Sequence, residues 1–130
     1  MPIEVPKATL EKWRKLVERL AFNSQKGRLT WEEGAISDSV VTNIADFTLS
    51  LTRTNDENRI DYIVRVFNNT GALIDYFMDS QVDTQANRYH YFRILDELFR
   101  EAQRKITGAD IALDEILDNL IASPDEEIPF

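Results

Sequence analysis

The side chains that most often carry out enzyme chemistry are sparse in this sequence. It contains no cysteine and a single histidine, His90, which lies between Tyr89 and Tyr91. A serine or threonine nucleophile needs a neighbouring base, and a lone histidine in this setting is more typical of a surface position. The four glycines are scattered, so no glycine-rich loop for phosphate binding is present. The lack of cysteine also excludes disulfides and thiolate metal sites and favours a reducing compartment.

The acidic side chains offer two pairs that acid–base or metal chemistry would require. Asp61 and Asp75 are expected on the same face of a β-hairpin, but a cross-strand contact of Asp75 with Arg65 explains that carboxylate without catalysis. Asp79 and Asp83 lack the surrounding ligand spacing that Ca²⁺ or Zn²⁺ sites need. We therefore expect a non-enzymatic protein with no catalytic residues, no cofactor and no metal.

The end of the chain carries the clearest functional signal. Its last six residues are three acids followed by an apolar triplet: Asp125, Glu126, Glu127, Ile128, Pro129 and Phe130. Proline opposes helix formation and the acids favour solvation, so we expect residues 123–130 to form a flexible acidic tail. A terminal ring and carboxylate suit capture by a protein partner with an apolar pocket and a basic rim.

This hexapeptide resembles the acidic tip of bacterial single-stranded DNA-binding proteins, in which a few acids precede Ile/Leu-Pro-Phe as the final residues. In that family the tip recruits genome-maintenance proteins such as helicases, nucleases and recombination mediators. The resemblance implies that Ile128, Pro129 and Phe130 fill a partner's pocket while the three acids steer binding. It covers six of 130 residues. The rest lacks the pattern of a five-stranded oligonucleotide-binding barrel and the family's Gly/Gln-rich linker, and no family is recognised for the folded body.

Charge is distributed unevenly along the chain, whose net charge is −8. Residues 106–130 contain seven acids and no base, whereas residues 1–28 carry seven bases against three acids. Lys12, Lys15 and Arg19 lie in the basic N-terminal part and are candidate contacts for nucleic acid or an acidic partner. The alternative is that they form an ordinary solvated helix face. Such asymmetry informs on partners rather than on fold.

The spacing of apolar residues predicts an α+β fold. A helix is expected over residues 7–22, followed by an antiparallel β-meander of three to four strands over about 40–78. A C-terminal helical hairpin, about 87–106 and 110–121, is expected to pack on one face of this sheet. Residues 23–46 are the least determined segment. Residues 1–122 are expected to form a single domain that precedes the tail.

The best-defined predicted element is a β-hairpin over residues 60–78. A three-residue loop ending in Gly71 sets Asn68 opposite Ala72 and Arg65 opposite Asp75. The same register gives three further cross-strand pairs: Val66–Ile74, Val64–Tyr76 and Tyr62–Met78. A one-residue slip would turn the Asp75 carboxylate towards the apolar face, which costs free energy if the charge is unpaired.

The second face of the predicted sheet combines apolar and polar side chains. Ile63, Phe67 and Phe77 are expected there among threonines and charged residues. An apolar patch with a polar rim is a candidate interface for a partner or for a homodimer. Alternatively, the N-terminal leader or residues 23–46 cover it.

We expect neither a membrane span nor a secretory signal in this sequence. No apolar stretch approaches the roughly 20 residues that span a bilayer, and the first residues do not form a secretory signal. We expect a cytoplasmic protein without membrane contact. The leading hypothesis is an interaction module, adaptor or competitor, that presents the tail. The alternatives are a nucleic-acid-binding protein and a regulatory or dimerisation domain that uses the second sheet face.

Overall fold

Helices flank a run of five strands along the chain, and the computed structural model describes residues 4–122. The elements are α1 (Lys7–Gln25), β1 (Glu32–Glu33), β2 (Ser39–Ile44), β3 (Phe47–Asp56), β4 (Arg59–Phe67), β5 (Leu73–Met78), α2 (Asp79–Val82), α3 (His90–Thr107) and α4 (Ala109–Asp118). The predicted α+β class is confirmed. The antiparallel sheet has the order β1-β2-β3-β4-β5. It has more strands than expected because the undetermined segment, residues 23–46, contributes both β1 and β2.

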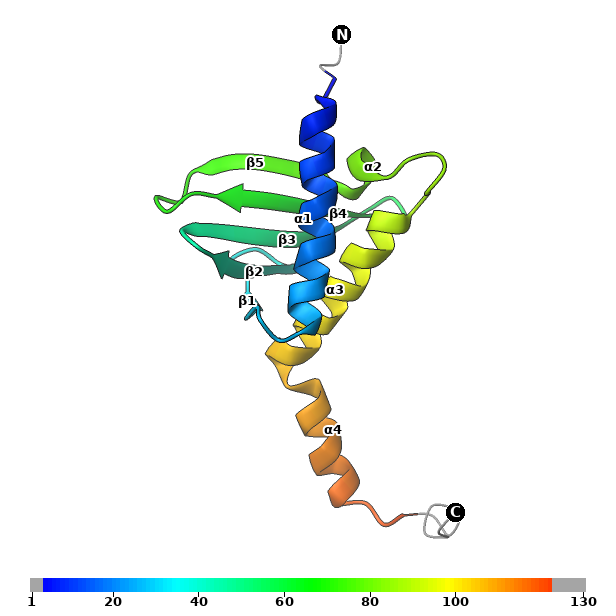
Figure 1. Ribbon diagram of the computed structural model, residues 1–130. Helices are drawn as coiled ribbons and strands as arrows, with labels where there is room; N and C mark the ends of the chain where they lie inside the picture. Colours follow the sequence, from blue (N-terminus) through cyan, green and yellow to red (C-terminus); the bar gives the residue numbers. More distant parts are fainter. Residues whose placement is uncertain (1–3, 123–130) are drawn as a thin grey trace.

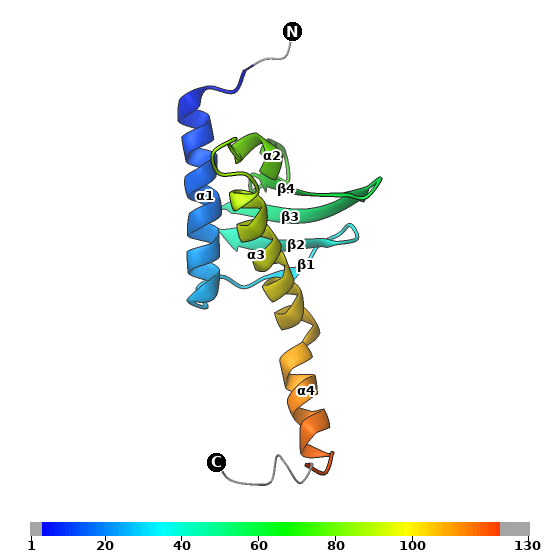
Figure 2. The ribbon, with the colours of Figure 1, turned by 90° about the vertical axis from the view of Figure 1, so that its right-hand side faces the viewer.

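Helices α1 and α3 pack against the same face of the sheet (Figures 1 and 2). The core forms where buried side chains of these two helices meet those of the strands. Its main members are Trp13, Val17 and Leu20 of α1, Leu95, Leu98 and Phe99 of α3, and Leu49, Leu51, Tyr62, Val64 and Phe77 of the sheet. Burial of apolar area, at roughly 25 cal/mol per Å², stabilises this two-layer arrangement.

The ends of both long helices are set by residues in the left-handed region. Gly27, with a φ of 70°, follows α1, which continues three residues beyond its predicted end. Tyr89, with a φ of 64°, precedes α3, and Gly108, with a φ of 69°, follows it. Glycine adopts such a φ without the steric cost of a Cβ atom, which explains both helix stops.

Within residues 4–122 no helix combines the length and the apolar composition that crossing a membrane requires.

The β4–β5 hairpin keeps its predicted turn but changes register one step later. The Asn68 N–H donates to the Ala72 carbonyl at 2.9 Å, as the predicted loop requires. Phe67 then pairs with Leu73, but Val66 pairs with Asp75, so Ile74 is an extra residue in β5. The predicted pairs Val66–Ile74, Val64–Tyr76, Tyr62–Met78 and Arg65–Asp75 are therefore wrong. A bulge inserts one residue and moves every following side chain of β5 to the other face.

Trp13 of α1 compensates for the shifted register of β5. Its indole Nε1–H donates to Asp75 Oδ2 at 2.9 Å, which provides a partner for the carboxylate turned towards the helices. The Trp13 ring also stacks on Phe77, with ring centroids 4.9 Å apart. Phe77 is 1% exposed and belongs to the core. Its predicted position on the second sheet face is wrong, for the same reason as the strand register.

Helix α4 does not fold back onto the sheet. Figures 1 and 2 show it leading away from the body beyond the end of α3, and none of its residues is buried. The predicted packing of a helical hairpin on one sheet face is therefore wrong for its second helix. Buried side chains of α1 and α3 already pack against the core residues of this sheet face.

Candidate interaction surfaces

Helix α4 presents an apolar stripe to solvent. The stripe, termed the α4 stripe below, consists of Leu113, Ile116, Leu117 and Leu120. Leu113, Ile116 and Leu117 lie on one face of α4, because steps of three and one residue keep them on the same side. Leu120 follows shortly after the helix ends at Asp118, and each of the four side chains is 49% exposed or more. Ile121, just beyond the helix, is 94% exposed. A contiguous apolar stripe on a charged helix is typical of a surface that packs on another element.

Negative charge borders the α4 stripe. Asp114 lies three residues before Leu117 and is therefore its neighbour on the helix surface. Asp118 follows Asp114 by one turn, and residues 106–130 contain no basic side chain. Asp110, at the start of α4, forms an ion pair with Arg104 of α3. The α4 stripe thus combines apolar contacts with an acidic margin.

Gly108 sets the direction in which α4 leaves the body. It is both the C-cap residue of α3 and the N-cap residue of α4. Its carbonyl accepts the Ala112 N–H at 2.9 Å. A Cβ atom at this position would meet no atom within 4 Å. Glycine is therefore favoured by its positive φ and not by a lack of space.

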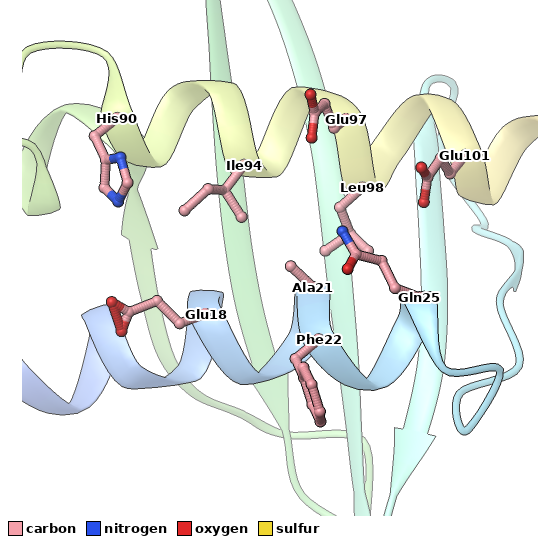
Figure 3. A pocket seen from close by; sticks show the side chains of 9 residues that line it. All are labelled: Glu18, Ala21, Phe22, Gln25, His90, Ile94, Glu97, Leu98 and Glu101. Atoms are coloured by element: carbon pink, nitrogen blue, oxygen red, sulfur yellow. The ribbon is translucent and has the colours of Figure 1, made fainter.

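One flank of α1 forms an acidic groove with α3 (Figure 3). The groove has a volume of about 340 Å³, and Ala21, Ile94 and Leu98 contribute apolar surface. Its carboxylates come from both helices: Glu18 from α1, and Glu97 and Glu101 from α3. Figure 3 shows the two α3 carboxylates along one side of the groove. A negatively charged rim of this kind disfavours an acidic occupant.

The other flank of α1, next to the end of β2, forms a recess with the opposite charge. This basic recess has a volume of about 270 Å³ and is lined by four apolar residues, Leu16, Leu20, Leu29 and Ile44, and by Arg19 and Arg28. None of the ion pairs within residues 4–122 involves either arginine. Both guanidinium groups therefore remain available to an acidic partner.

The predicted nucleic-acid contacts Lys12, Lys15 and Arg19 are all exposed on α1. Arg19 borders the basic recess described above. Lys12 and Lys15 line neither that recess nor the acidic groove. They are exposed basic side chains, which suit backbone phosphates or solvent equally.

The second sheet face does not assemble the predicted patch. Ile63 and Phe67 do lie on it, because they alternate with the buried residues of β4, but both are half-buried. Phe77 is in the core. Arg65 crosses this face and its Nη1 donates to Thr52 Oγ1 at 3.2 Å, so its partner is Thr52 and not Asp75. The second sheet face therefore exposes less apolar surface than the sequence analysis predicts.

A polar recess of about 730 Å³ lies where α2, the start of β4 and the start of α3 meet. Of its three carboxylates, that of Asp61 pairs with Arg59, and those of Asp79 and Asp83 accept backbone N–H groups. Asp79 accepts the Tyr62 N–H at 2.8 Å, and Asp83 accepts the Tyr91 N–H at 2.7 Å. Burial raises the pKa of Asp79, and the negative charges of Asp61 and Asp83 add to the effect.

Among the residues that the structure describes, no three His, Cys, Asp or Glu side chains are grouped to hold a metal.

Residues Asp125 to Phe130, the predicted partner-binding tip, lie outside the described residues, so their assignment stays a prediction. The α4 stripe, the acidic groove and the basic recess were not predicted as sites. The absence of bases after Lys105 was the one sequence signal that separated the α4 region from the body.

Comparison with known proteins gives no match: no family model, no curated protein and no solved structure is similar to this chain. The surfaces themselves are thus the basis for assigning a function.

Proposed function

We propose that this chain is a non-enzymatic protein–protein interaction module that presents its C-terminal segment to bacterial genome-maintenance proteins. In this proposal it acts as an adaptor or as a competitor of the single-stranded DNA-binding protein's own tip. The observation that carries the proposal is the direction of α4, which leads away from the body (Figure 1). The chain is exposed throughout residues 110–122, two residues before the acidic hexapeptide begins.

The chemistry of the tip supports this proposal. Ile128, Pro129 and Phe130 offer apolar groups and a ring, and Phe130 supplies the terminal carboxylate if it is the last residue. The acids before them raise the association rate with a basic pocket at low salt. The carboxylates of the polar recess support a non-enzymatic role, because Asp79 and Asp83 already bond to backbone N–H groups.

A binding experiment tests the proposal with a purified bacterial helicase or nuclease that binds the single-stranded DNA-binding protein's tip. We expect the full chain to bind it, deletion of Phe130 to abolish binding, and one alanine added after Phe130 to weaken it, because the carboxylate then moves. Ser123→Ala, outside the hexapeptide, is the matched control and should bind as the full chain does. Unchanged binding after deletion of Phe130 would contradict the proposal.

Nucleic-acid binding is a second candidate, favoured by the exposure of Lys12, Lys15 and Arg19 on one helix. In this case the acidic end of the chain competes with the nucleic-acid phosphates for these three basic side chains. We then expect single-stranded DNA to bind in a strongly salt-dependent manner and to bind more tightly after removal of residues 123–130. Replacing Lys12, Lys15 and Arg19 by glutamine should reduce the salt dependence of DNA binding. No DNA binding at low salt would exclude this candidate.

A further inference from the structure

We propose that the α4 stripe docks in the basic recess of a second copy of this chain. Each copy of the resulting dimer contributes one α4 and one recess. This inference concerns residues 109–121 and the α1–β2 flank, and so goes beyond the proposed role of the hexapeptide.

Helix α4 and the residues just after it leave apolar surface unburied. Leu117 and Leu120 are 64% and 63% exposed, and Leu113 and Ile116 complete the stripe at 49% and 54%. Soluble proteins rarely leave a contiguous apolar stripe in water, and such surfaces mark contacts. The ordered helix Ala109–Asp118 supplies a rigid face of this kind. A complementary apolar surface on a partner would bury the α4 stripe.

Charge selects the basic recess over the acidic groove. Both flank α1, and both combine apolar side chains with charged ones. An acidic helix brought to the groove would meet Glu18, Glu97 and Glu101, whereas at the basic recess it would meet Arg19 and Arg28. Like charges across an interface cost free energy, and opposite charges favour both encounter and register. Asp114 and Asp118 beside the α4 stripe therefore favour the recess.

The size of the basic recess fits side chains of the α4 stripe. An apolar cavity of about 150 Å³ holds a benzene molecule, so the 270 Å³ of the recess holds one or two leucine side chains. Leu16 and Leu29 offer an apolar lining, and Ile44, which is 36% exposed, extends it along β2. Leu117 and one neighbour fill this volume, and the rest of the stripe lies across the rim.

The arrangement of the fold makes a reciprocal contact geometrically simple. The end of α1, which lines the recess, and the start of α4 lie at the same end of the molecule (Figures 1 and 2). A two-fold axis beside this end places each α4 on the partner's recess at once. Such an isologous interface is closed and uses both surfaces of each copy, so no α4 stripe remains to bind a third copy. Within one chain, α4 points away from the body and would have to reverse at Gly108 to reach the recess.

Sedimentation equilibrium of the full chain tests this proposal. At tens of micromolar we expect the mass of two 15.1 kDa chains. Leu117→Asp, on an exposed residue whose change leaves the core intact, should give the mass of one chain. Arg19→Glu/Arg28→Glu should raise the dimer Kd by about tenfold or more. Lys12→Glu, an exposed base on α1 outside the recess, is the matched control and should not change the mass.

A mixing experiment makes the assignment of both surfaces falsifiable. Chains with Arg19→Glu/Arg28→Glu and chains with Asp114→Lys/Asp118→Lys should each dimerise about tenfold more weakly or worse than the unaltered chain, because like charges then face one another. Mixed in equal amounts they should form a two-copy complex, because each reversed surface now meets its opposite. Circular dichroism confirms that both variants are folded.

Three results would overturn the proposal. The first is a single-copy mass for the unaltered chain up to several hundred micromolar. The second is a dimer that Leu117→Asp leaves intact, and the third is a dimer that resists Arg19→Glu/Arg28→Glu, which would place another surface opposite α4. Deletion of Phe130 leaves the predicted dimer unchanged, so failure of the dimer and failure of the tip-binding proposal are separate outcomes.

Discussion

Helices α3 and α4 follow one another across a single glycine, yet their apolar stripes have opposite fates. In α3, Leu95, Leu98 and Phe99 are each 2% exposed or less, whereas the α4 stripe is 49% exposed or more throughout. Both sequences show the spacing of an amphipathic helix. Such spacing therefore identifies a helix face that packs on a partner, but it does not indicate whether that partner belongs to the same chain.

Helix α3 is bound to the body by polar as well as apolar contacts. The Tyr62 hydroxyl, from the centre of the sheet, donates to Asp96 Oδ1 at 2.5 Å, and Asp96 also pairs with Arg100 at 3.0 Å. Helix α4 has one described ion pair with the body, between the exposed side chains of Arg104 and Asp110. An exposed pair of this kind contributes little to stability. The two helices therefore differ in how they are held as well as in burial.

The largest predicted difference comes from matched leucine substitutions in the two helices. Leu95→Ala removes a fully buried side chain and should lower the free energy of unfolding by about 2–5 kcal/mol. Leu117→Ala removes an exposed one and should change it by less than about 0.5 kcal/mol at concentrations where the chain is a single copy. Denaturant unfolding measures both. A cost for Leu117→Ala near that of Leu95→Ala would mean that α4 packs on its own chain.

Tyr62→Phe tests the polar link between the sheet and α3. It removes the hydroxyl donor to Asp96 and should cost about 1–2 kcal/mol at neutral pH, because the acceptor is charged. Burial and the Asp96 carboxylate raise the pKa of Tyr62 above its ordinary value. The phenol is neutral in both states below about pH 10. Above that pH the unfolded chain loses its proton first, so stability falls as pH rises.

The control for Tyr62 lies in the same pH titration. The Tyr62→Phe chain should lose less stability than the unaltered chain between neutral and strongly alkaline pH. Equal alkaline losses in both chains would show that the hydroxyl of Tyr62 is not linked to folding. Tyr76→Phe, at a tyrosine that is 58% exposed, should behave as the unaltered chain does.

A smaller effect is expected at the junction between the two helices. Gly108→Ala places a Cβ atom in open space but on a residue with a φ of 69°, so it should cost about 1 kcal/mol through backbone strain. Gly27→Ala, after α1, has a φ of 70° and equally open space and is the matched control. Similar costs are expected in thermal unfolding, since both glycines end helices that pack in the core. A much larger cost at Gly108 would mean that the position of α4 contributes to the stability of the body.

The sequence sufficed to predict the fold class and the approximate residue ranges of α1, α3 and α4, because these depend on local spacing and on glycine stops. It did not suffice for the β4–β5 register, because the bulge at Ile74 is supported by the contact between Trp13 and Asp75, which lie 62 residues apart. The place of α4 was missed for a related reason. Only the packed structure shows that α1 and α3 already cover the sheet.

The candidate surfaces were less predictable than the fold. Arg19 and Arg28 are nine residues apart, and they border one recess only because α1 ends beside Leu29 and Ile44. The basic character of α1 was visible in the sequence, but the acidic groove on its other flank was not. That groove depends on Glu97 and Glu101 of α3, which tertiary packing brings to Glu18. The acidic hexapeptide, by contrast, is a property of the sequence alone.

Amide hydrogen exchange, read separately over α3 and α4 at several protein concentrations, tests most directly whether the outward helix is a contact surface. We predict slow exchange in α3 at every concentration, because its opening requires disruption of the core. In α4 we predict fast exchange in dilute solution and protection that grows with concentration as the second copy binds. Protection of α4 equal to that of α3 at the lowest concentration would contradict the account, since the helix would then be packed within its own chain.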